Sequence, residues 1–347
     1  MTVASHDRTG RGRTPDASAG ASAGGNAPAD TSRHQPVDTP ADASKTRSAN
    51  APADTSRHQP VDTPADAFEA ERGRLLGLAY RITASRSTAE DLVQDAWIRW
   101  QRMDPTTLDR PAAWLTTVTS RLALDHLKSA RHQREAYVGP WLPEAVAAGS
   151  DPADQLELAE SLTIGFLAVL ERLGPTERVV FLLADVFSVP YEEIASVVDK
   201  SPEACRQLAS RARRRVREER PRFSPTDDQA WQVTAAFLEA AQAGDLDSLV
   251  SLLADDAVLV SDGGPDHHAA RRPVVAARIP RFVANLAKRI PEGAVVTPRL
   301  LNGQPAVVVT QGDRPTLALV VSVSEGQVVS VYALVNPDKL AASTTSC

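Results

Sequence analysis

Apolar residues recur at helical spacing in the block after residue 67, and this pattern predicts three long helices. The first, over 69–84, repeats leucine and isoleucine every three or four positions. The second, over 88–102, has an apolar stripe with two tryptophans and an acidic opposite face. The third begins near Pro111 and becomes basic toward its end. An all-α bundle over 68–136 is therefore expected.

Helical periodicity returns at 156–172, after a linker over 137–155 that contains proline and glycine. A Leu-Gly-Pro-Thr-Glu break then opens another helix, because proline suits a first helical turn. Two further helices are expected at 191–198 and 202–218, separated by a short turn. Together these elements predict a second all-α domain over 156–222.

The pattern changes after Pro225. Helices are expected over 229–243 and 246–253, with another near 274–290. Apolar runs predict strands at 257–261, 305–310, 316–323 and 327–335. Turn signals lie at 303–304 and 325–327, the second of them in a hairpin. Helices followed by several antiparallel strands predict an α+β domain over 226–340, and 341–347 is expected to be a flexible tail.

Residues 1–67 contain almost no large apolar side chains, and one 18-residue segment occurs identically at 26–43 and 50–67. Such a segment cannot bury enough surface to offset its ordering entropy, so a disordered tail with a recent duplication is expected. No apolar run approaches the roughly 20 residues that cross a bilayer, and the start has no secretory signal. The expected compartment is the cytoplasm, with no membrane partner.

The two cysteines, Cys205 and Cys347, imply no disulfide framework. No Cys/His cluster has zinc spacing, so neither a metal nor a cofactor is expected. The formal net charge of −6 does not favour a nucleic-acid partner, but its distribution does. Residues 206–222 hold eight arginines and two acids, which is typical of a phosphate-binding segment.

The arginine-rich segment belongs to a pattern typical of a helix-turn-helix over 191–217. Ser201 is a good N-cap, and Pro202 suits the first helical position. We expect Ile194, Ala195 and Val198 to pack on Ala204, Leu208 and Ala212. The outward positions, suited to base edges in the major groove, are then Arg206, Gln207, Ser210, Arg211 and Arg214. Arg213, Arg215 and Arg217 are better placed for phosphate. An ordinary helical hairpin is the alternative.

Several motifs carry a resemblance to a known family. Ala-Glu-Asp-Leu-Val-Gln-Asp-Ala-Trp at 89–97 resembles sigma region 2.2 of extracytoplasmic-function (ECF) sigma factors. Residues 110–131, which begin Arg-Pro-Ala-Ala-Trp-Leu, are similar to regions 2.3 and 2.4, and the helix-turn-helix resembles region 4.2. The resemblance covers about 150 residues in matching order, whereas the helical pattern alone would also fit a generic amphipathic bundle.

The resemblance implies an alternative sigma factor that binds core RNA polymerase and directs promoter-specific initiation. Its partners would be promoter DNA and the β′ clamp helices and β flap of the polymerase. Residues implied to face the clamp helices are Asp91, Gln94 and Asp95. Those implied to meet the −10 element are Arg121, Asp125, Lys128 and Arg131. The helix from Ser201 onward would read the −35 element through the outward residues given above.

Three further motifs resemble the SigJ-like subgroup of ECF sigma factors, which carries a C-terminal SnoaL-like (NTF2-like) extension. They are Trp-Leu-Pro-Glu at 141–144, Asp-Gly-Gly at 262–264 and Asn-Pro-Asp-Lys-Leu at 336–340. We expect the extension to dock on the linker and regulate the sigma domains in cis. The residues expected to make this contact are Trp141, Leu142, Pro143, Asp262, Gly263, Gly264, Asn336, Pro337, Asp338, Lys339 and Leu340. The resemblance also implies that no dedicated anti-sigma protein exists.

The SnoaL-like fold is shared with isomerases and cyclases, so two alternatives for the extension stay open. It could sense a small molecule, or it could retain proton-transfer chemistry. The candidate groups are Asp262, His267 and His268, or Asp255 and Asp256. Asp262 precedes two glycines, where an aspartate commonly caps its own backbone, and the histidines fall in a polar loop. We therefore expect no enzyme. A helix-turn-helix repressor that works without polymerase is a third reading.

Overall fold

The computed structural model describes residues 63–104, 107–135, 137, 139–147, 163–219, 228–265 and 269–344. Most of the expected disordered tail, with its duplicated segment, lies outside these residues. Its last part does not behave as a tail, because α1 (Pro64–Thr83) begins there. The hydroxyl of Thr63 accepts from the Asp66 backbone while the Asp66 carboxylate accepts from the Thr63 backbone. This capping box moves the start of the first domain back to residue 63.

The first domain consists of α1, α2 (Arg86–Gln101) and α3 (Pro111–Glu135), close to the predicted spans. Their buried faces carry the apolar residues that set the helical period, including Leu75, Ile82 and Trp100. The Trp100 indole N–H donates to the backbone oxygen of Pro64 at 2.7 Å, which closes the bundle around a buried aromatic ring.

The second domain contains α5 (Ile164–Leu170), α6 (Pro175–Phe181), α7 (Tyr191–Val198) and α8 (Pro202–Glu219). A five-residue π-helical turn, η2 (Leu182–Val186), continues α6. Residues 148–162, which include the end of the predicted linker and the start of its next helix, lie outside the described residues. The first two domains share one apolar core rather than forming two separate ones.

The third domain is α+β, as predicted. Its helices are α9 (Asp228–Ala243), α10 (Leu246–Leu252) and α11 (Ile279–Ala287). Its strands are β1 (Leu253–Asp262), β2 (Val274–Val275), β3 (Val295–Leu301), β4 (Gln304–Gln311), β5 (Arg314–Ser324) and β6 (Gln327–Leu334). They form one sheet in the order β2-β1-β6-β5-β4-β3, in which only the β1–β6 pair is parallel.

Two features of this sheet differ from the predictions. The single helix expected over 274–290 is instead β2, a 3-10 turn η3 (Ala276–Arg278) and the shorter α11. Strand β3 was not predicted, because Pro298 interrupts it, which an edge strand tolerates. It joins β4 through an Asn302-Gly303 turn, in which both residues have positive φ, the geometry of the tight turns that hairpins favour.

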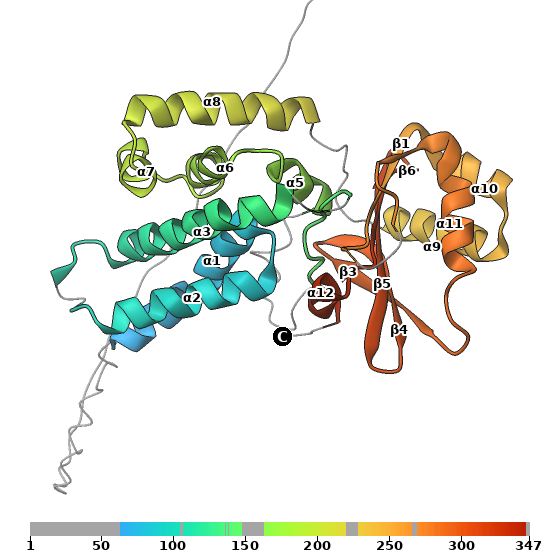
Figure 1. Cartoon of the computed structure of the whole chain (residues 1–347), viewed down its shortest axis with the longest axis horizontal. Coiled ribbons are helices and arrows are strands. Elements are labelled where there is room, and N and C mark those ends of the chain that lie inside the picture. The colour runs from blue at the N-terminus through green and yellow to red at the C-terminus, as the bar shows by residue number, and fades with distance from the viewer. Residues whose placement is uncertain are drawn as a thin grey trace, which may run out of the picture. The chain divides into compact units, whose positions relative to one another are not determined.

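The sheet is covered on both faces. Helices α9, α10 and α11 lie on one side of it (Figure 1), where they enclose an apolar core with Phe237 and Leu249. The other face packs on residues from outside the domain, including Leu142 and Ala147 of the linker and Ile164 of α5. The predicted flexible tail is wrong for residues 341–344. After the short α12 (Pro337–Leu340), η4 (Ala341–Ser343) is docked, because the Ala147 N–H donates to the Ala342 oxygen at 3.2 Å.

Candidate functional site

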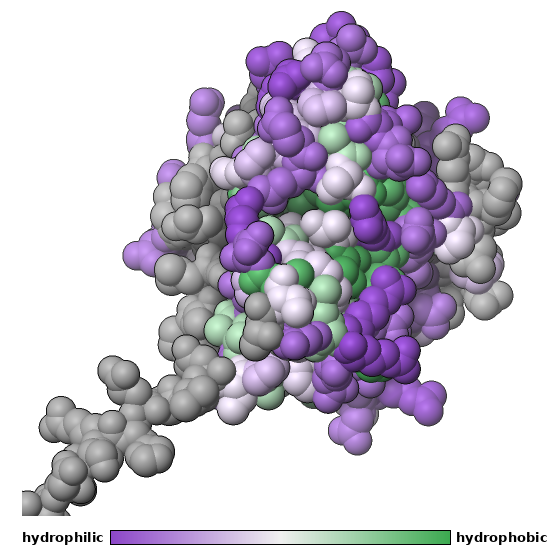
Figure 2. Space-filling view, turned by 90° about the vertical axis from the view of Figure 1, so that its left-hand side faces the viewer, coloured by the Kyte–Doolittle hydropathy of each residue, from purple (hydrophilic) through white to green (hydrophobic). Residues whose placement is uncertain are grey.

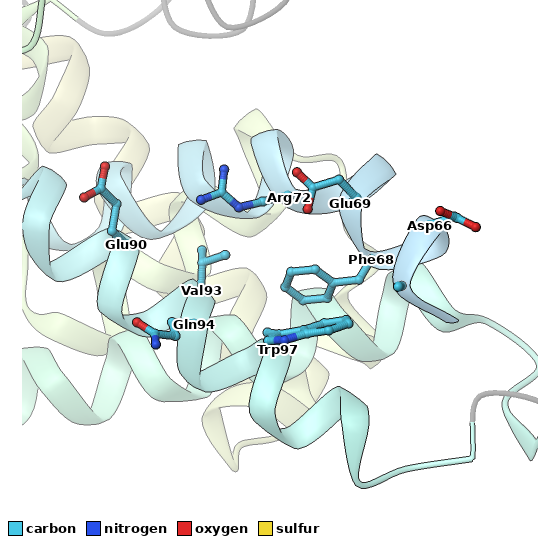
Figure 3. Close-up of a pocket in the computed structure, with 9 residues that line it drawn as sticks. Asp66, Phe68, Glu69, Arg72, Glu90, Val93, Gln94 and Trp97 are labelled. Atoms are coloured by element: carbon cyan, nitrogen blue, oxygen red, sulfur yellow. The ribbon is translucent and has the colours of Figure 1, made fainter. Parts of the chain in front are cut away.

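The exposed face of α2 carries the three residues predicted to contact polymerase, Asp91, Gln94 and Asp95. Beside it lies a groove of about 570 Å³ between α1 and α2, which Gln94 helps to line. In Figure 3 the Phe68 ring lies over Trp97, with a centroid separation of 4.9 Å, and polar side chains from both helices surround the pair. Phe68 is buried and Trp97 is half-buried, so this aromatic pair belongs to the core of the bundle and also lines the groove.

The residues predicted to meet the −10 element lie on α3, but the second domain touches this helix. The Arg121 guanidinium donates to the Ser196 oxygen of α7 at 2.6 Å. Arg110, just before α3, forms an ion pair with Glu193 of α7. Asp125 and Lys128 are exposed, 3.9 Å apart, as a surface pair. Arg131 falls within α3, but its side chain lies outside the described part of the structure.

Helix α8 begins as predicted, with the Ser201 hydroxyl accepting from the Ala204 N–H at 3.2 Å. Its inner face differs slightly from the predicted one. The residues in the core are Cys205, Ala209, Ala212 and Val216, whereas Ala204 and Leu208 are only half-buried. Burial raises the pKa of the Cys205 thiol, which disfavours the reactive thiolate.

The arginines of α8 fall into two groups. Three of them pair within the domain: Arg206 with Glu192 and Glu203, Arg213 with Asp185, and Arg215 with Glu177. Arg213 and Arg215 were predicted as phosphate contacts, yet their guanidinium groups already hold carboxylates. Within the described ranges no ion pair or hydrogen bond involves the side chains of Arg211 and Arg214, which are exposed together with Gln207 and Ser210. This helix, uppermost in Figure 1, forms the polar crest at the top of Figure 2.

Among the described residues predicted to read base edges, Arg211 and Arg214 are the exposed arginines without a carboxylate partner. We expect Arg214→Ala to weaken binding to a cognate promoter by about 5- to 100-fold, since a base contact is worth roughly 1–3 kcal/mol. The matched control is Arg281→Ala, an exposed arginine on α11. Filter binding or fluorescence anisotropy with the polymerase-bound chain measures both. Equal affinities for Arg214→Ala and the unmodified chain would contradict this role for α8.

The predicted regulatory residues meet around Asp262, at the end of β1. Both carboxylate oxygens are engaged. Oδ2 accepts from the Leu142 backbone N–H at 2.8 Å and from Lys339 Nζ at 2.7 Å. Oδ1 accepts from the Gly264 N–H at 3.0 Å, the local turn that the sequence predicted, and from the Tyr137 hydroxyl. Asp262 and Lys339 have side-chain exposures of 0% and 5%, so this is a buried ion pair.

Lys339 also joins α12 to the linker. Its ammonium group donates to the Leu142 oxygen at 2.6 Å and lies 3.1 Å from the centre of a Trp141 ring, a cation–π contact. Tyr137 packs edge-on against Trp141, and its hydroxyl accepts from Asn336 at 3.1 Å. Burial, followed by its hydrogen bond to Asp262, raises the pKa of Tyr137 well above its usual range.

The remaining motif residues support this contact. Gly264 has a φ of +66°, and a Cβ there would lie 2.9 Å from the Asn336 side chain, so glycine is required. Gly263 and Pro143 are buried, and Leu340 packs in the same cluster as Leu142. Pro337 and Asp338 are exposed. The structure thus brings the three motifs together, with two of the eleven predicted residues pointing outward.

A second contact, which the sequence analysis missed, joins α1, the linker and the β3–β4 turn. The Tyr80 hydroxyl donates to the Glu144 oxygen at 2.6 Å and accepts from Asn302 at 2.9 Å. Asn302 also accepts from the Val146 N–H, and the Glu144 carboxylate accepts from the Arg86 N–H at the start of α2. Burial raises the pKa of Tyr80 above its usual range. The linker is therefore fixed to the first and third domains at once.

Among the described residues, the candidate proton-transfer groups do not line the cavity of the third domain. Asp255 and Asp256 are exposed on β1, and His267 and His268 lie outside the described residues. Between the helices and the sheet is a cavity of about 30 Å³, lined by apolar side chains and Gln242. Within the described ranges, no group of three or more His, Cys, Asp or Glu side chains is arranged to hold a metal ion, and no helix is long and apolar enough to cross a membrane.

An acidic α2 face, a partly basic α3 and an arginine-rich helix-turn-helix define a promoter-recognition subunit of the sigma type. A family model for Sigma-70 region 2 matches residues 67–133, and one for Sigma-70, region 4 matches 165–216. The ECF RNA polymerase sigma factor SigJ of Mycobacterium tuberculosis is 40% identical over 80% of this chain and 93% of its own length. The probable ECF RNA polymerase sigma factor SigI of the same species is 36% identical over 79% of this chain and 93% of its own length.

The solved structures give the same result. The crystal structure of M. tuberculosis SigJ matches with a TM-score of 0.65 and 38% identity, covering 80% of this chain and 98% of that one. The chain therefore belongs to the ECF RNA polymerase sigma factors, and it acts as an alternative sigma factor that directs transcription initiation. The predicted architecture, two helical sigma domains followed by an α+β domain, is confirmed.

Proposed function

We propose that the SnoaL-like domain regulates this sigma factor in cis by holding the linker and keeping the two sigma domains together. The observation that carries the proposal is the packing of α7 on α3. Arg121, proposed to meet the −10 element, donates instead to a carbonyl of the other sigma domain. By their numbering, the −10 and −35 elements lie about 25 base pairs apart. This spacing corresponds to roughly 85 Å of duplex at 3.4 Å per base pair. Two sigma domains that share one apolar core cannot contact both promoter elements at once.

The linker explains how the third domain exerts this control. It is the stretch of chain that joins the two sigma domains, and its described part is held at two points, by Asp262 and Lys339 and by Tyr80 and Asn302. Release of either point lengthens the chain available between the domains. We propose that core polymerase selects the released state, with its clamp helices on the α2 face and its flap on the second sigma domain. No dedicated anti-sigma protein is then required.

The ion pair between Arg110 and Glu193 gives a direct test of the closed arrangement. In Glu193→Arg the attraction becomes repulsion. Surface pairs are worth less than about 1 kcal/mol, which corresponds to about fivefold, so we expect affinity of the free chain for promoter DNA to rise about twofold to fivefold. The double variant Arg110→Glu/Glu193→Arg restores an opposite-charge pair and should return to the original affinity. Unchanged affinity in Glu193→Arg, or no rescue by the swap, would count against the proposal.

We also propose that the SnoaL-like domain is a regulator and not an enzyme. Both oxygens of Asp262 already accept hydrogen bonds, which leaves this carboxylate poorly placed as a general base. A cavity of about 30 Å³ has room for about one water molecule but not for a carbonyl substrate. Turnover of a small carbonyl compound by the purified chain would overturn this part of the proposal, and specific repression without polymerase would favour the repressor reading.

A further inference from the structure

The guanidinium of Arg213 makes the most extensive ion-pair contact on α8. Its Nε lies 3.0 and 2.8 Å from the two oxygens of Asp185, and Nη2 lies 2.6 Å from Oδ1 of the same carboxylate. Nη2 also donates to the Tyr191 hydroxyl at 2.8 Å. A forked arginine–carboxylate pair fixes orientation as well as distance, because two parallel bonds cannot both survive a rotation.

This contact joins three separate elements. Asp185 lies in the π-helical turn η2, Tyr191 is the first residue of α7, and Arg213 lies in the second half of α8. The middle of the inner face of α8 is built from small residues, with Cys205, Ala209 and Ala212 fully buried, whereas the larger Val216 is buried nearer its end. Small residues set how closely α8 approaches the domain, but they oppose rotation about the helix axis only weakly.

Rotation of α8 matters because its outward residues have to meet base edges. Side chains bring the radius of a helix to about 5–6 Å, so a roll of about 20° moves a side-chain tip by roughly 2 Å. A hydrogen bond of about 3 Å does not survive such a shift. The roll of α8 therefore decides whether Gln207, Arg211 and Arg214 reach bases or only phosphates.

We propose that Arg213, held by Asp185 and Tyr191, is a positioning residue that sets the roll of α8 and thereby the base preference of the helix. This proposal rests on the proposed function of α8 as the reader of the −35 element. Arg213 itself does not contact DNA in this account. Its role differs from that of Arg211 and Arg214, which face outward on the same helix.

Base preference and salt dependence separate the competing roles of Arg213. A lost phosphate contact lowers the slope of log affinity against log salt by about 0.9 and leaves base preference intact. A lost positioning contact relaxes base preference and leaves the slope unchanged. A contact that serves only folding lowers the melting temperature without changing either property of the folded fraction.

The experiment uses holoenzyme assembled from the full chain and core RNA polymerase, with a promoter duplex library randomised across the −35 window. The variants are Arg213→Lys, which keeps the charge but loses the fork, and Asp185→Asn, which changes a residue outside α8. Tyr191→Phe removes a single hydroxyl and serves as the mildest variant. Arg281→Lys and Asp247→Asn, at exposed positions of the third domain, are the matched controls.

We expect Arg213→Lys and Asp185→Asn each to reduce discrimination between the preferred and mismatched −35 windows by about fivefold or more, with no further loss in the double variant. The slope of log affinity against log salt should stay at the value of the unmodified chain, including in a further variant, Arg213→Gln, which removes the charge. Unchanged base preference in Asp185→Asn, or a slope lowered by about 0.9 in Arg213→Gln, would overturn the proposal. An unmodified holoenzyme without base preference in this window would instead contradict the proposed function of α8, on which the proposal rests.

Discussion

Lys339→Met is expected to destabilise the docked linker by about 3–5 kcal/mol relative to the released one, the usual cost of leaving one partner of a buried ion pair alone. Asp262 would keep a buried carboxylate without its cation, and Trp141 would lose its cation–π contact. The Leu142 amide, which donates to Asp262, should then exchange its hydrogen much faster than in the unmodified chain. Hydrogen–deuterium exchange over residues 137–147 measures the release directly.

The controls for this variant come from the chain itself. Lys288→Met removes an exposed lysine from the end of α11 and should leave linker exchange unchanged. The double variant Asp262→Asn/Lys339→Met removes both charges, so it should recover part of the lost protection. If linker hydrogen exchange is equally slow in Lys339→Met and Lys288→Met, the buried pair does not hold the linker.

Asp91→Lys/Asp95→Lys is expected to weaken binding to core RNA polymerase by at least about 100-fold. The exposed face of α2 presents these carboxylates to the proposed clamp-helix surface, and like-charge contact at an interface costs several kcal/mol. Competition against the unmodified chain for a limited amount of core enzyme, followed by run-off transcription, measures the loss. Asp247→Lys, an exposed acid on α10, is the control. Equal competition by both variants would remove the α2 face from the proposed polymerase contact.

Much of the fold follows from local patterns. Helical periodicity gave α1, α2, α7 and α8 to within a few residues, because their buried faces repeat along one stripe. The edge strand β3 escaped prediction, since its exposed positions and Pro298 hide the strand pattern. The predicted tails at the two ends of the chain were both too long. Thr63 and Asp66 cap α1 locally, whereas η4 is ordered by packing against a distant linker segment.

The candidate sites likewise combine features that local sequence predicts with long-range contacts that it does not. The motifs at 141–144, 262–264 and 336–340 were recognised through resemblance, and the structure supplies the reason that they meet, a buried pair between Asp262 and Lys339. The contact of Tyr80 with Asn302 joins residues 222 positions apart and belongs to no motif. Nor does local sequence reveal that Arg213 is occupied, because Asp185 lies 28 residues away. The sequence pattern could not predict which charged residues pair across long separations in the chain.

The central claim, that the chain holds its two sigma domains together until polymerase separates them, can be tested by one distance measurement. Spin labels at Ser129→Cys on α3 and Glu218→Cys on α8, with Cys347→Ser, report the separation by pulsed electron resonance. The account predicts one short distance in the free chain and an increase of more than roughly 30 Å with core polymerase and promoter DNA, given the roughly 85 Å between the two elements. A long distance in the free chain, or a short one in the promoter complex, would contradict it.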